Sequence, residues 1–499
     1  MRKEILVNAT PPETRIAFTE DGKTVEVLHE RRNRQGFVGN IYKARVHRVL
    51  PGMQAAFVSI GLDRDAFLYV EDAMPRPEDA ESEEVGNDTL AAARERREDR
   101  ARIDDLVKEG QEIVVQVTKD PFSGKGPRVT TNIALPGRTL VYLPGVSEVA
   151  ISRRITDTAE RERLRGLLEA LPADGGFIAR TAAEGASPAE IEADRAYLTD
   201  LAGRITRRAE SSAAPALLHR ELELSMRALR DLAGRDVEVV RVDDEAAALR
   251  LTEFLRAVAP PLASRVEVFR RAEPIFGFFG VEAEIEAALE SRVPLPSGGS
   301  IVIHQTEALV AIDVNTGRFV GREDLEETVF ALNLEAVPEI ARQMRLRDLG
   351  GLLVVDFIDM VDPEHRREVF EKFEAELAGD RSRTRVLQIS DFGLVEITRQ
   401  RSRGNLERVL TRTCSECGGV GRVKTDLTAA LDLRRALLAP LSLATPGQTV
   451  KIRVHPTLGQ LLREDEPEIL SEIETASNLR IEPVDDTALS SGGYVIERG

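Results

Sequence analysis

The chain has no long apolar run. Nowhere in its 499 residues is there an apolar stretch of about 18 residues, the length that a membrane-spanning helix needs. The first ten residues, MRKEILVNAT, also lack the apolar centre of a signal peptide. The sequence therefore predicts a cytoplasmic protein.

Cysteine and tryptophan are scarce, with two cysteines and no tryptophan. Two cysteines exclude the disulfide framework on which small secreted domains depend. A chain of 499 residues with 42% hydrophobic side chains is too long for one core, so we expect a multidomain α/β protein.

Positive charge is also in deficit, because the formal net charge is −17, which argues against a nucleic-acid partner. The charge is unevenly spread. Residues 71–88 hold eight acidic and one basic side chain (−7), and residues 451–499 hold ten and five (−5). Between Glu396 and Lys424 the balance reverses, and a local basic surface remains possible; the alternative is a set of solvated helix faces. Its basic residues are Arg399, Arg401, Arg403, Arg408, Arg412, Arg422 and Lys424.

Two aspartates each end an apolar run: Asp313 in ALVAID and Asp356 in LGGLLVVD. The second run is apolar on both faces, which predicts a strand in the centre of a sheet. Two carboxylates drawn together repel each other unless a cation relieves them, and Mg²⁺ binds one or two carboxylates beside a substrate phosphate. Asn315 adds an oxygen donor on the same face.

A bland alternative exists for each aspartate. A single aspartate at a strand end more often caps a turn or the following helix. Two of them, joined by one strand–helix–strand crossover, favour a metal site at the carboxyl ends of the strands.

Residues 36–132 contain alternating runs (FVGNIYKARVHRVL, MQAAFVSIG, AFLYV and QEIVVQVTKD) that predict a five-stranded barrel. An acidic, then helix-prone insertion interrupts it at about 75–104. Phe57 and Phe67 fall on successive strands, where an RNA-binding barrel would offer rings for base stacking beside Lys43, Lys119 and Lys125. For either phenylalanine alone, the core is the commoner place.

Local signals outline the rest of the chain. A Glu20-Asp21-Gly22 turn predicts a hairpin near the start. The run RTLVYL predicts a strand, and 161–171 and 188–208 predict helices. The last 75 residues predict a small α/β appendage.

The only cysteines, Cys414 and Cys417, form CSECGG, the shape of a zinc knuckle. Structural zinc takes four ligands, and this motif supplies two. Histidines of this chain could complete the set, or the same two cysteines of a second subunit could do so across a two-fold axis. A redox motif and two idle thiols are the alternatives.

These features in this order resemble the ribonuclease E/G family over nearly the whole chain. IYKARVHRVLPGMQAAFVSIG resembles its S1-type (OB-fold) RNA-binding domain, and ALVAIDVNTGR, NLEAVPEIARQMRLRDLGGLLVVDFIDM and GLVEITRQR resemble its DNase I-like catalytic subdomain. CSECGGVGRV resembles its zinc-link. Because the chain ends at Gly499 without a long disordered tail, it most resembles the ribonuclease G branch.

The resemblance implies a domain order. Residues 1–35 and 215–280 would form an RNase H-like subdomain, 36–132 the inserted S1 barrel, and 133–214 a 5′-sensor region. The catalytic subdomain would span 281–410, the zinc-link 411–424 and a small C-terminal domain 425–499.

The resemblance also implies an activity: endonucleolytic cutting of single-stranded RNA to 5′-phosphate and 3′-hydroxyl ends, with preference for 5′-monophosphorylated RNA, in rRNA maturation and mRNA decay. Asp313 and Asp356 would hold catalytic Mg²⁺ with help from Asn315, and Cys414 and Cys417 would share zinc in a homodimer. The sensor would comprise Gly137, Val141, Arg180, Thr181 and Arg383. A non-catalytic, dimeric RNA-binding scaffold is the rival reading.

Overall fold

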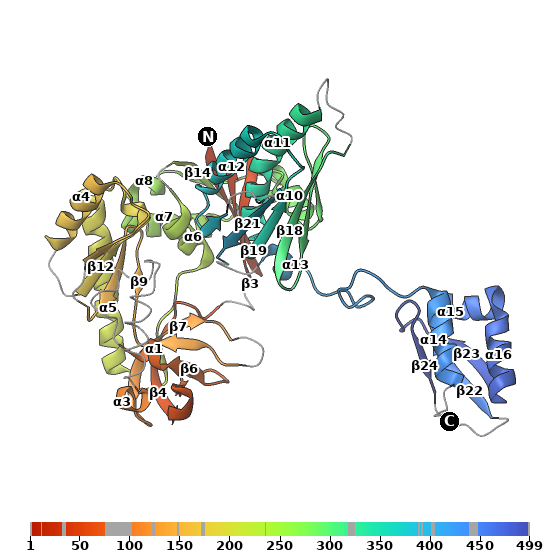
Figure 1. Cartoon of the computed structure of the whole chain (residues 1–499). Coiled ribbons are helices and arrows are strands. Elements are labelled where there is room, and N and C mark those ends of the chain that lie inside the picture. Colours follow the sequence, from red (N-terminus) through yellow and green to blue (C-terminus); the bar gives the residue numbers. More distant parts are fainter. Residues whose placement is uncertain are drawn as a thin grey trace. The chain divides into compact units, whose positions relative to one another are not determined.

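The computed structural model describes residues 2–10, 12–31, 36–74, 102–121, 125–146, 149–170, 175–234, 236–317, 325–387, 390, 393–400, 405–438 and 448–497. It divides into two compact units, Met1–Leu406 and Glu407–Gly499 (Figure 1). Of the described helices, none is both long and apolar enough to cross a membrane. The predicted acidic insertion lies outside the described residues except at 102–104.

The first sheet of unit 1 combines distant parts of the chain. Its order is β15-β14-β1-β2-β3, with β1 parallel to β14 and antiparallel to β2. The predicted hairpin joins β2 to β3, and Asp21 and Gly22 take the positive φ angles of 48° and 81° that its turn needs. The strands are Lys3–Thr10 (β1), Glu13–Glu20 (β2), Lys23–Arg31 (β3), Val237–Val242 (β14) and Val266–Val268 (β15); helices Leu224–Leu232 (α6), Glu245–Val258 (α7) and Pro260–Ala263 (α8) contribute to its core.

The predicted five-stranded barrel is confirmed. Strands β4, β5, β6, β8 and β7 follow one another, and a β4–β7 pairing closes the ring. A sixth strand, β13, pairs with β4 from outside. The elements are Ile41–Leu50 (β4), Pro51–Met53 (η2), Ala55–Ser59 (β5), Ala66–Tyr69 (β6), Val70–Ala73 (α1), Ile103–Leu106 (α3), Glu112–Lys119 (β7), Arg128–Thr130 (β8) and Ala216–His219 (β13).

Between the barrel strands and β13, the chain builds a four-stranded sheet of order β11-β12-β10-β9. Apolar side chains of α4 and α5 share its core. The N-terminus of α5 has a capping box, in which Ser187 and Glu190 satisfy each other's backbone N–H groups. The elements are Leu135–Pro136 (β9), Leu140–Pro144 (β10), Val149–Ile151 (β11), Thr158–Glu169 (α4), Gly175–Ala179 (β12), Thr181–Ala183 (η4) and Pro188–Ser211 (α5).

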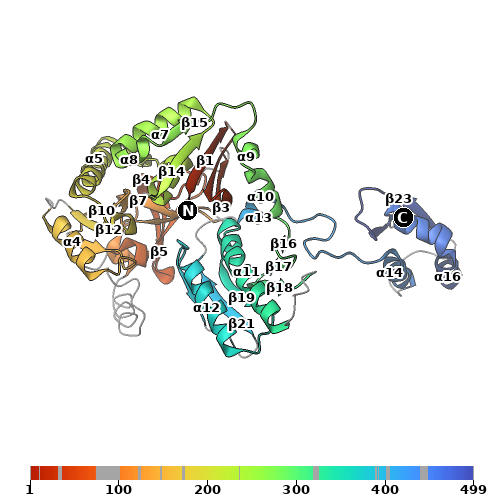
Figure 2. The same cartoon turned by 90° about the horizontal axis from the view of Figure 1, so that it is seen from above.

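A six-stranded sheet carries the two aspartates, in the order β16-β17-β18-β19-β21-β20. Helices α11 and α12 lie side by side over one face and share its core (Figure 2). The elements are Ile275–Phe278 (α9), Val281–Ala287 (α10), Arg292–Pro294 (β16), Ser300–Gln305 (β17), Leu309–Asn315 (β18), Leu325–Leu346 (α11), Gly351–Asp356 (β19), Pro363–Leu377 (α12), Thr384–Val386 (β20) and Leu394–Arg399 (β21).

Strand β19 is central in this sheet, as its sequence predicts, but it is not covered on both faces. Leu353 and Val355 are fully buried under the helices, whereas Leu352 on the opposite face is 40% exposed. The strand is thus apolar on both faces, but the helices cover only one of them. The open face of the sheet is the one that bears Asp313 and Asp356.

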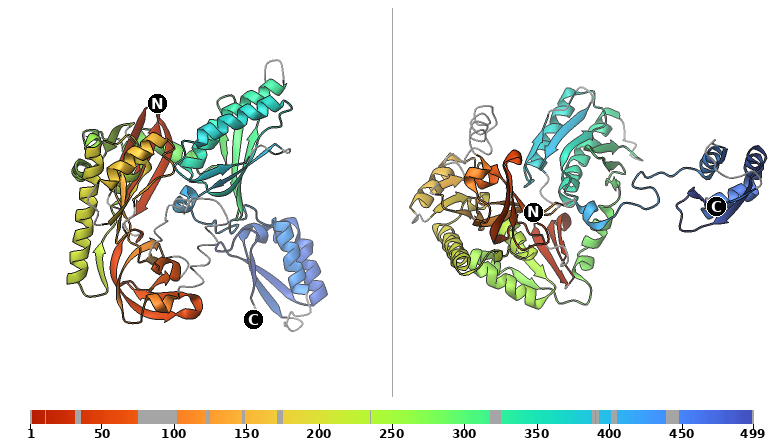
Figure 3. Two further views of the ribbon diagram at one scale, coloured as in Figure 1. Left: turned by 60° about the vertical axis from the view of Figure 1, so that its left-hand side comes forward. Right: turned by 90° about the horizontal axis from the view of Figure 1, so that it is seen from below.

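Unit 2 contains a three-stranded sheet of order β23-β22-β24, and α14 and α16 pack together with it around one apolar core (Figure 3). Its elements after α13 (Leu406–Leu410) are Asp426–Leu438 (α14), Thr449–Val454 (β22), Pro456–Gln460 (α15), the π-helical turn Leu461–Asp465 (η5), Pro467–Ser477 (α16), Arg480–Asp485 (β23) and Tyr494–Ile496 (β24).

Candidate active site

The two aspartates are direct neighbours across two strands. Strands β18 and β19 are parallel, and their register pairs Asp313 with Asp356. Both side chains lie on the open face and are exposed. Because paired residues of neighbouring strands point to the same side of a sheet, the strand–helix–strand crossover brings the carboxylates together at the carboxyl ends of the strands, as predicted.

Asn315 stands two residues beyond Asp313 and is tied to it. Its side-chain Nδ2 donates a hydrogen bond of 2.8 Å to Asp313 Oδ2. This bond favours one orientation of the Asp313 carboxylate. Asn315 therefore orients the aspartate directly.

The electrostatics favour a cation here. Partial burial, then the charges of Asp313 and Asp359, raise the pKa of Asp356 above its ordinary value. A raised carboxyl pKa means that the ionised form of Asp356 is destabilised by burial and by the neighbouring negative charges. A hard divalent cation would offset this destabilisation. Among the described residues there is no group of three or more His, Cys, Asp or Glu side chains that could hold a metal. The donors present are the two paired carboxylates, which are oxygen ligands of the kind that Mg²⁺ takes beside a substrate phosphate.

Asp359 is a residue that the sequence reasoning missed. Its charge acts on Asp356, and a Cβ added to Gly393 would lie 3.2 Å from Asp359 Oδ1. Asp359 thus belongs to the electrostatic surroundings of the pair. The signal was present in the sequence DFID, but only the turn after β19 shows that the second aspartate bends back toward the first.

A second candidate surface lies on the barrel. Phe57 and Phe67 are cross-strand partners, with ring centroids 4.7 Å apart, and both rings are half-buried. Directly paired residues of four neighbouring strands continue this row: Phe57, Phe67, Arg128 and Lys119. The structure therefore brings both rings and one of the predicted lysines onto one face. Lys125 lies just before β8 and is exposed.

Lys43 does not join this row. Its Nζ lies 3.1 Å from a carboxylate oxygen of Glu112 and donates to the Ser212 carbonyl at 2.9 Å. Tyr69 and Arg128, which the sequence reasoning missed, are better placed. Tyr69 is 37% exposed, its ring centroid lies 6.5 Å from that of Phe67, and the Arg128 guanidinium lies 4.7 Å from the Tyr69 ring centre. The two-residue spacing from Phe67 was the available signal for Tyr69.

The predicted 5′-sensor residues gather around Arg180. Its Nη1 donates to the carbonyl of Gly137 and, at 2.7 Å, to Asp231 Oδ1. Val141 lies on β10 opposite Ile178 of β12, the strand that leads to Arg180. Thr181 is exposed, and its hydroxyl lies 3.2 Å from that of Ser152. The guanidinium of Arg180 and the hydroxyl of Thr181 are thus neighbours on one surface. This surface, formed by Gly137, Arg180 and Thr181, is called the Arg180 ledge below.

Arg383 comes from the turn before β20, and hydrogen bonds attach that turn to the same region. Arg381 donates to the carbonyl of Leu232 at 2.6 Å, next to Asp231. Arg154 donates to the carbonyl of Arg381 at 2.6 Å. The structure therefore brings the Arg383 segment to the border of the Arg180 ledge.

Gly137 leaves room for a buried carboxylate. A Cβ at Gly137 would meet Asp194 Oδ1 at 2.4 Å. Asp194 is only 1% exposed, and it accepts hydrogen bonds from the backbone N–H groups of Arg138, Thr139 and Leu140 at 3.2, 2.7 and 2.9 Å. Helix α5 inserts this carboxylate where a side chain would stand.

The cysteine motif forms a tight turn in unit 2. Cys414 is exposed and Cys417 is half-buried. Backbone N–H groups of Gly421 and Gly419, and then the Cys414 thiol, hydrogen-bond the Cys417 sulfur and lower its pKa. A lowered thiol pKa favours the thiolate that metals bind, so the motif fits half of a zinc site.

The predicted basic surface between Glu396 and Lys424 is only partly present. Arg399 is not on the surface: its side chain is 4% exposed and pairs with Asp380 at 2.7 Å and Asp348 at 2.8 Å. Lys424 is paired with Asp432. Arg408, Arg412 and Arg422 belong to unit 2 and are exposed, whereas Arg401 and Arg403 lie outside the described residues.

Comparison with known sequences agrees with this arrangement. The family model described as Ribonuclease E/G family matches residues 134–402, a range that includes both the Arg180 ledge and the aspartate pair. The chain belongs to the ribonuclease E/G family. Within that family, the chain is 44% identical over 475 residues to Ribonuclease G of Escherichia coli (strain K12), which covers 95% of each chain.

Sequence identities to other members of the family distinguish its ribonuclease G and ribonuclease E branches. Ribonuclease G of Haemophilus influenzae is 42% identical over 480 residues, with 96% of each chain covered. Ribonuclease E of Escherichia coli (strain K12) is 35% identical over 478 residues, which is 95% of this chain and 44% of that protein. The predicted greater similarity to ribonuclease G than to ribonuclease E is confirmed.

Proposed function

We propose that the chain is a Mg²⁺-dependent endoribonuclease that cuts single-stranded RNA to 5′-phosphate and 3′-hydroxyl products and prefers RNA with a 5′-monophosphate. Membership of the family makes the chain an endoribonuclease; the metal, the products and the preference are the proposal. The observation that carries it is the register pairing of Asp313 with Asp356 on an open sheet face.

The residues divide the chemistry between them. Asp313 and Asp356 would hold the ion, which when bound polarises the scissile phosphate and makes a water more nucleophilic. Asn315 holds the Asp313 carboxylate in one orientation through its 2.8 Å hydrogen bond. Since the two aspartates sit on adjacent strands of one sheet rather than on loops, their spacing is set before RNA arrives.

Recognition of the 5′ end would fall to the Arg180 ledge. A guanidinium offers a planar fork that suits phosphate oxygens, and the Thr181 hydroxyl is exposed beside it. Asp231 and the Gly137 carbonyl hold Arg180 in place. Binding the 5′ end away from the cut would favour catalysis by ordering the RNA on the enzyme.

The proposed roles are ribosomal RNA maturation and mRNA decay, in the cytoplasm where such transcripts are found. The enzyme would act as a homodimer in which Cys414 and Cys417 of two copies share one zinc ion. The two neighbouring thiols of one CxxC turn and the lowered pKa of Cys417 support this assignment.

The decisive experiment is cleavage of a short, unstructured, fluorescent RNA that carries either a 5′-monophosphate or a 5′-hydroxyl, with Mg²⁺ or with EDTA. We expect cutting that requires Mg²⁺ and is faster for the monophosphate. Binding without cutting under every condition would support the RNA-binding scaffold instead. Equal rates for the two ends would remove the sensor from the proposal and leave the nuclease.

Replacing Phe57 by alanine is expected to weaken RNA binding by about tenfold or more, since stacking on one ring contributes roughly 1–3 kcal/mol per base. Fluorescence anisotropy of the same RNA measures this change. Phe278→Ala is the control, because Phe278 is a phenylalanine with 37% of its surface exposed that lies outside the barrel. Equal loss in both variants would mean that the barrel row has no special role.

Replacing Cys414 by serine is expected to remove zinc and to convert the dimer into monomers. Wild-type protein should contain about one zinc per two chains, measured by metal analysis, and light scattering should follow the mass. Ser415→Ala, which alters a neighbouring side chain of the same turn, is the control. A dimer that persists in the zinc-free variant would contradict the shared site.

A further inference from the structure

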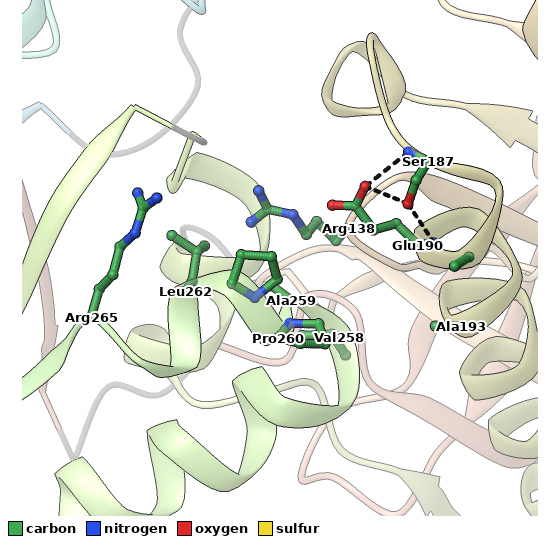
Figure 4. Close-up of a pocket in the computed structure, with 11 residues that line it drawn as sticks. Arg138, Ser187, Glu190, Ala193, Val258, Ala259, Pro260, Leu262 and Arg265 are labelled. Atoms are coloured by element: carbon green, nitrogen blue, oxygen red, sulfur yellow. Dashed lines mark hydrogen bonds between the residues drawn. The ribbon is translucent and has the colours of Figure 1, made fainter.

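A pocket lies outside all the surfaces considered so far, between helix α5 and the α7–α8 corner (Figure 4). Its volume is about 510 Å³, within the range in which proteins hold small organic molecules. Ala189 and Ala193 line it from α5, and Val258, Pro260 and Leu262 line it from the corner. The pocket therefore has a largely apolar wall.

Two guanidinium groups enter this apolar space. Arg138 and Arg265 both line the pocket, and Figure 4 shows their side chains extending into the space beside the corner. Backbone carbonyls hold each in place: Arg138 Nη1 donates to Ala233 at 3.0 Å, and Arg265 Nη1 donates to Val237. Arg138 is only 7% exposed, so its charge is fixed in a poorly solvated position.

The charge balance of the lining is positive. Glu190 is the one carboxylate among the lining residues, and its Oε2 already accepts hydrogen bonds from the Ser187 N–H and hydroxyl at 2.8 and 2.9 Å. Two anchored guanidinium groups facing one such carboxylate leave a net positive site. An anion bound there would gain charge-assisted hydrogen bonds from the guanidinium groups.

We propose that this pocket binds a small organic anion, in which a phosphate or carboxylate group meets Arg138 and Arg265 and an apolar body rests against the prolines and alanines. The chemistry required is a planar or branched anionic head on an apolar group. An inorganic anion would bind the guanidinium groups but would leave the apolar side chains of the pocket exposed to water. None of the lining residues belongs to the aspartate pair or to the predicted sensor residues.

The test is isothermal titration of the full-length protein with phenyl phosphate, benzoate and inorganic phosphate. We expect at least one of the two ring-bearing anions to bind, and inorganic phosphate to bind at least about tenfold more weakly. Whichever of phenyl phosphate and benzoate binds with the higher affinity identifies the preferred head group, phosphate or carboxylate. Wild-type protein that binds neither more tightly than about 1 mM would overturn the proposal.

Variants assign the binding to the pocket. Ala193→Phe should fill the space and weaken binding of the ring-bearing anion by about tenfold or more, while Ala196→Phe, on the same helix but outside the lining, should leave it unchanged. Arg265→Leu should reduce affinity similarly, and it decides the question should Ala193→Phe fail to fold. Arg180→Ala identifies any part of the signal that comes from phosphate bound at Arg180. Unchanged binding in the folded Ala193→Phe and Arg265→Leu proteins, or a signal that Arg180→Ala abolishes completely, would contradict the assignment.

Discussion

Replacing Asp356 by asparagine is expected to lower kcat on single-stranded RNA by about 10³-fold or more, because metal-ion stabilisation of the transition state is worth several kcal/mol. Asp313→Asn should behave alike, since the two carboxylates are register partners. Single-turnover cleavage measures the loss, and anisotropy in EDTA checks that RNA binding survives.

Glu396→Gln is the matched control. Glu396 is exposed and pairs in register with Val354 on the same sheet, so it removes one carboxylate from the open face without touching the pair. It should cut at close to the wild-type rate. An Asp356→Asn protein that folds and cuts normally would refute the metal assignment, whatever the control does.

The Asp356→Asn substitution should also make the metal-free protein slightly more stable at neutral pH. The folded-state pKa of Asp356 is raised above its ordinary value of 3.8, so the folded protein carries an electrostatic penalty that appears as pH rises through that pKa and is absent below 3.8. Removing the charge removes the penalty. The gain should stay below about 1 kcal/mol, because the group is exposed.

Thermal unfolding in EDTA at two pH values measures this effect. The Asp356→Asn variant should have the higher Tm at pH 7, and the difference should shrink near pH 4. A lower Tm for the variant at pH 7 would mean that the ionised carboxylate is needed to cap the turn after β19, which is the bland alternative for this residue.

Arg180→Ala is expected to lower kcat/KM for 5′-monophosphorylated RNA by about 10- to 100-fold, since a hydrogen bond to a charged group contributes roughly 1.5–3 kcal/mol. Cleavage of 5′-hydroxyl RNA should be nearly unchanged, because that substrate offers no phosphate to the ledge. The ratio of the two rates is the measurement. Arg180→Lys should restore little of it, because a single ammonium lacks the planar fork.

Asp231 provides a second test of the ledge. Burial alone would raise its pKa, but hydrogen bonds and charge from Arg230 and Arg180 outweigh burial and lower it. Asp231→Asn should therefore loosen Arg180 and reduce the preference for the monophosphate in the same direction. Arg230 has 6% of its side chain exposed, and among the described residues the variant leaves Glu221 as its carboxylate partner. The assay should therefore be run well below the unfolding temperature of the variant. An unchanged ratio in both variants would exclude Arg180 from 5′-end recognition.

Much of this protein follows from local sequence. The hairpin turn at Asp21 and Gly22, the strand ends at Asp313 and Asp356, and the successive barrel strands with Phe57 and Phe67 depend on residue spacing and on turn chemistry within a few positions. These signals are local, and a side chain's face on a strand is fixed by its spacing alone. The aspartate pair could therefore be predicted from two apolar runs.

Only the tertiary structure decided which distant residues meet. Gly137 gives its place to Asp194 of α5, Arg399 is buried between Asp348 and Asp380, and the open face of the sheet leaves Leu352 exposed. Pairings of this kind join residues far apart in sequence, and no local pattern encodes which partner fills a given space. Packing settles them, because each buried charge or absent side chain must be matched by whatever the fold brings beside it.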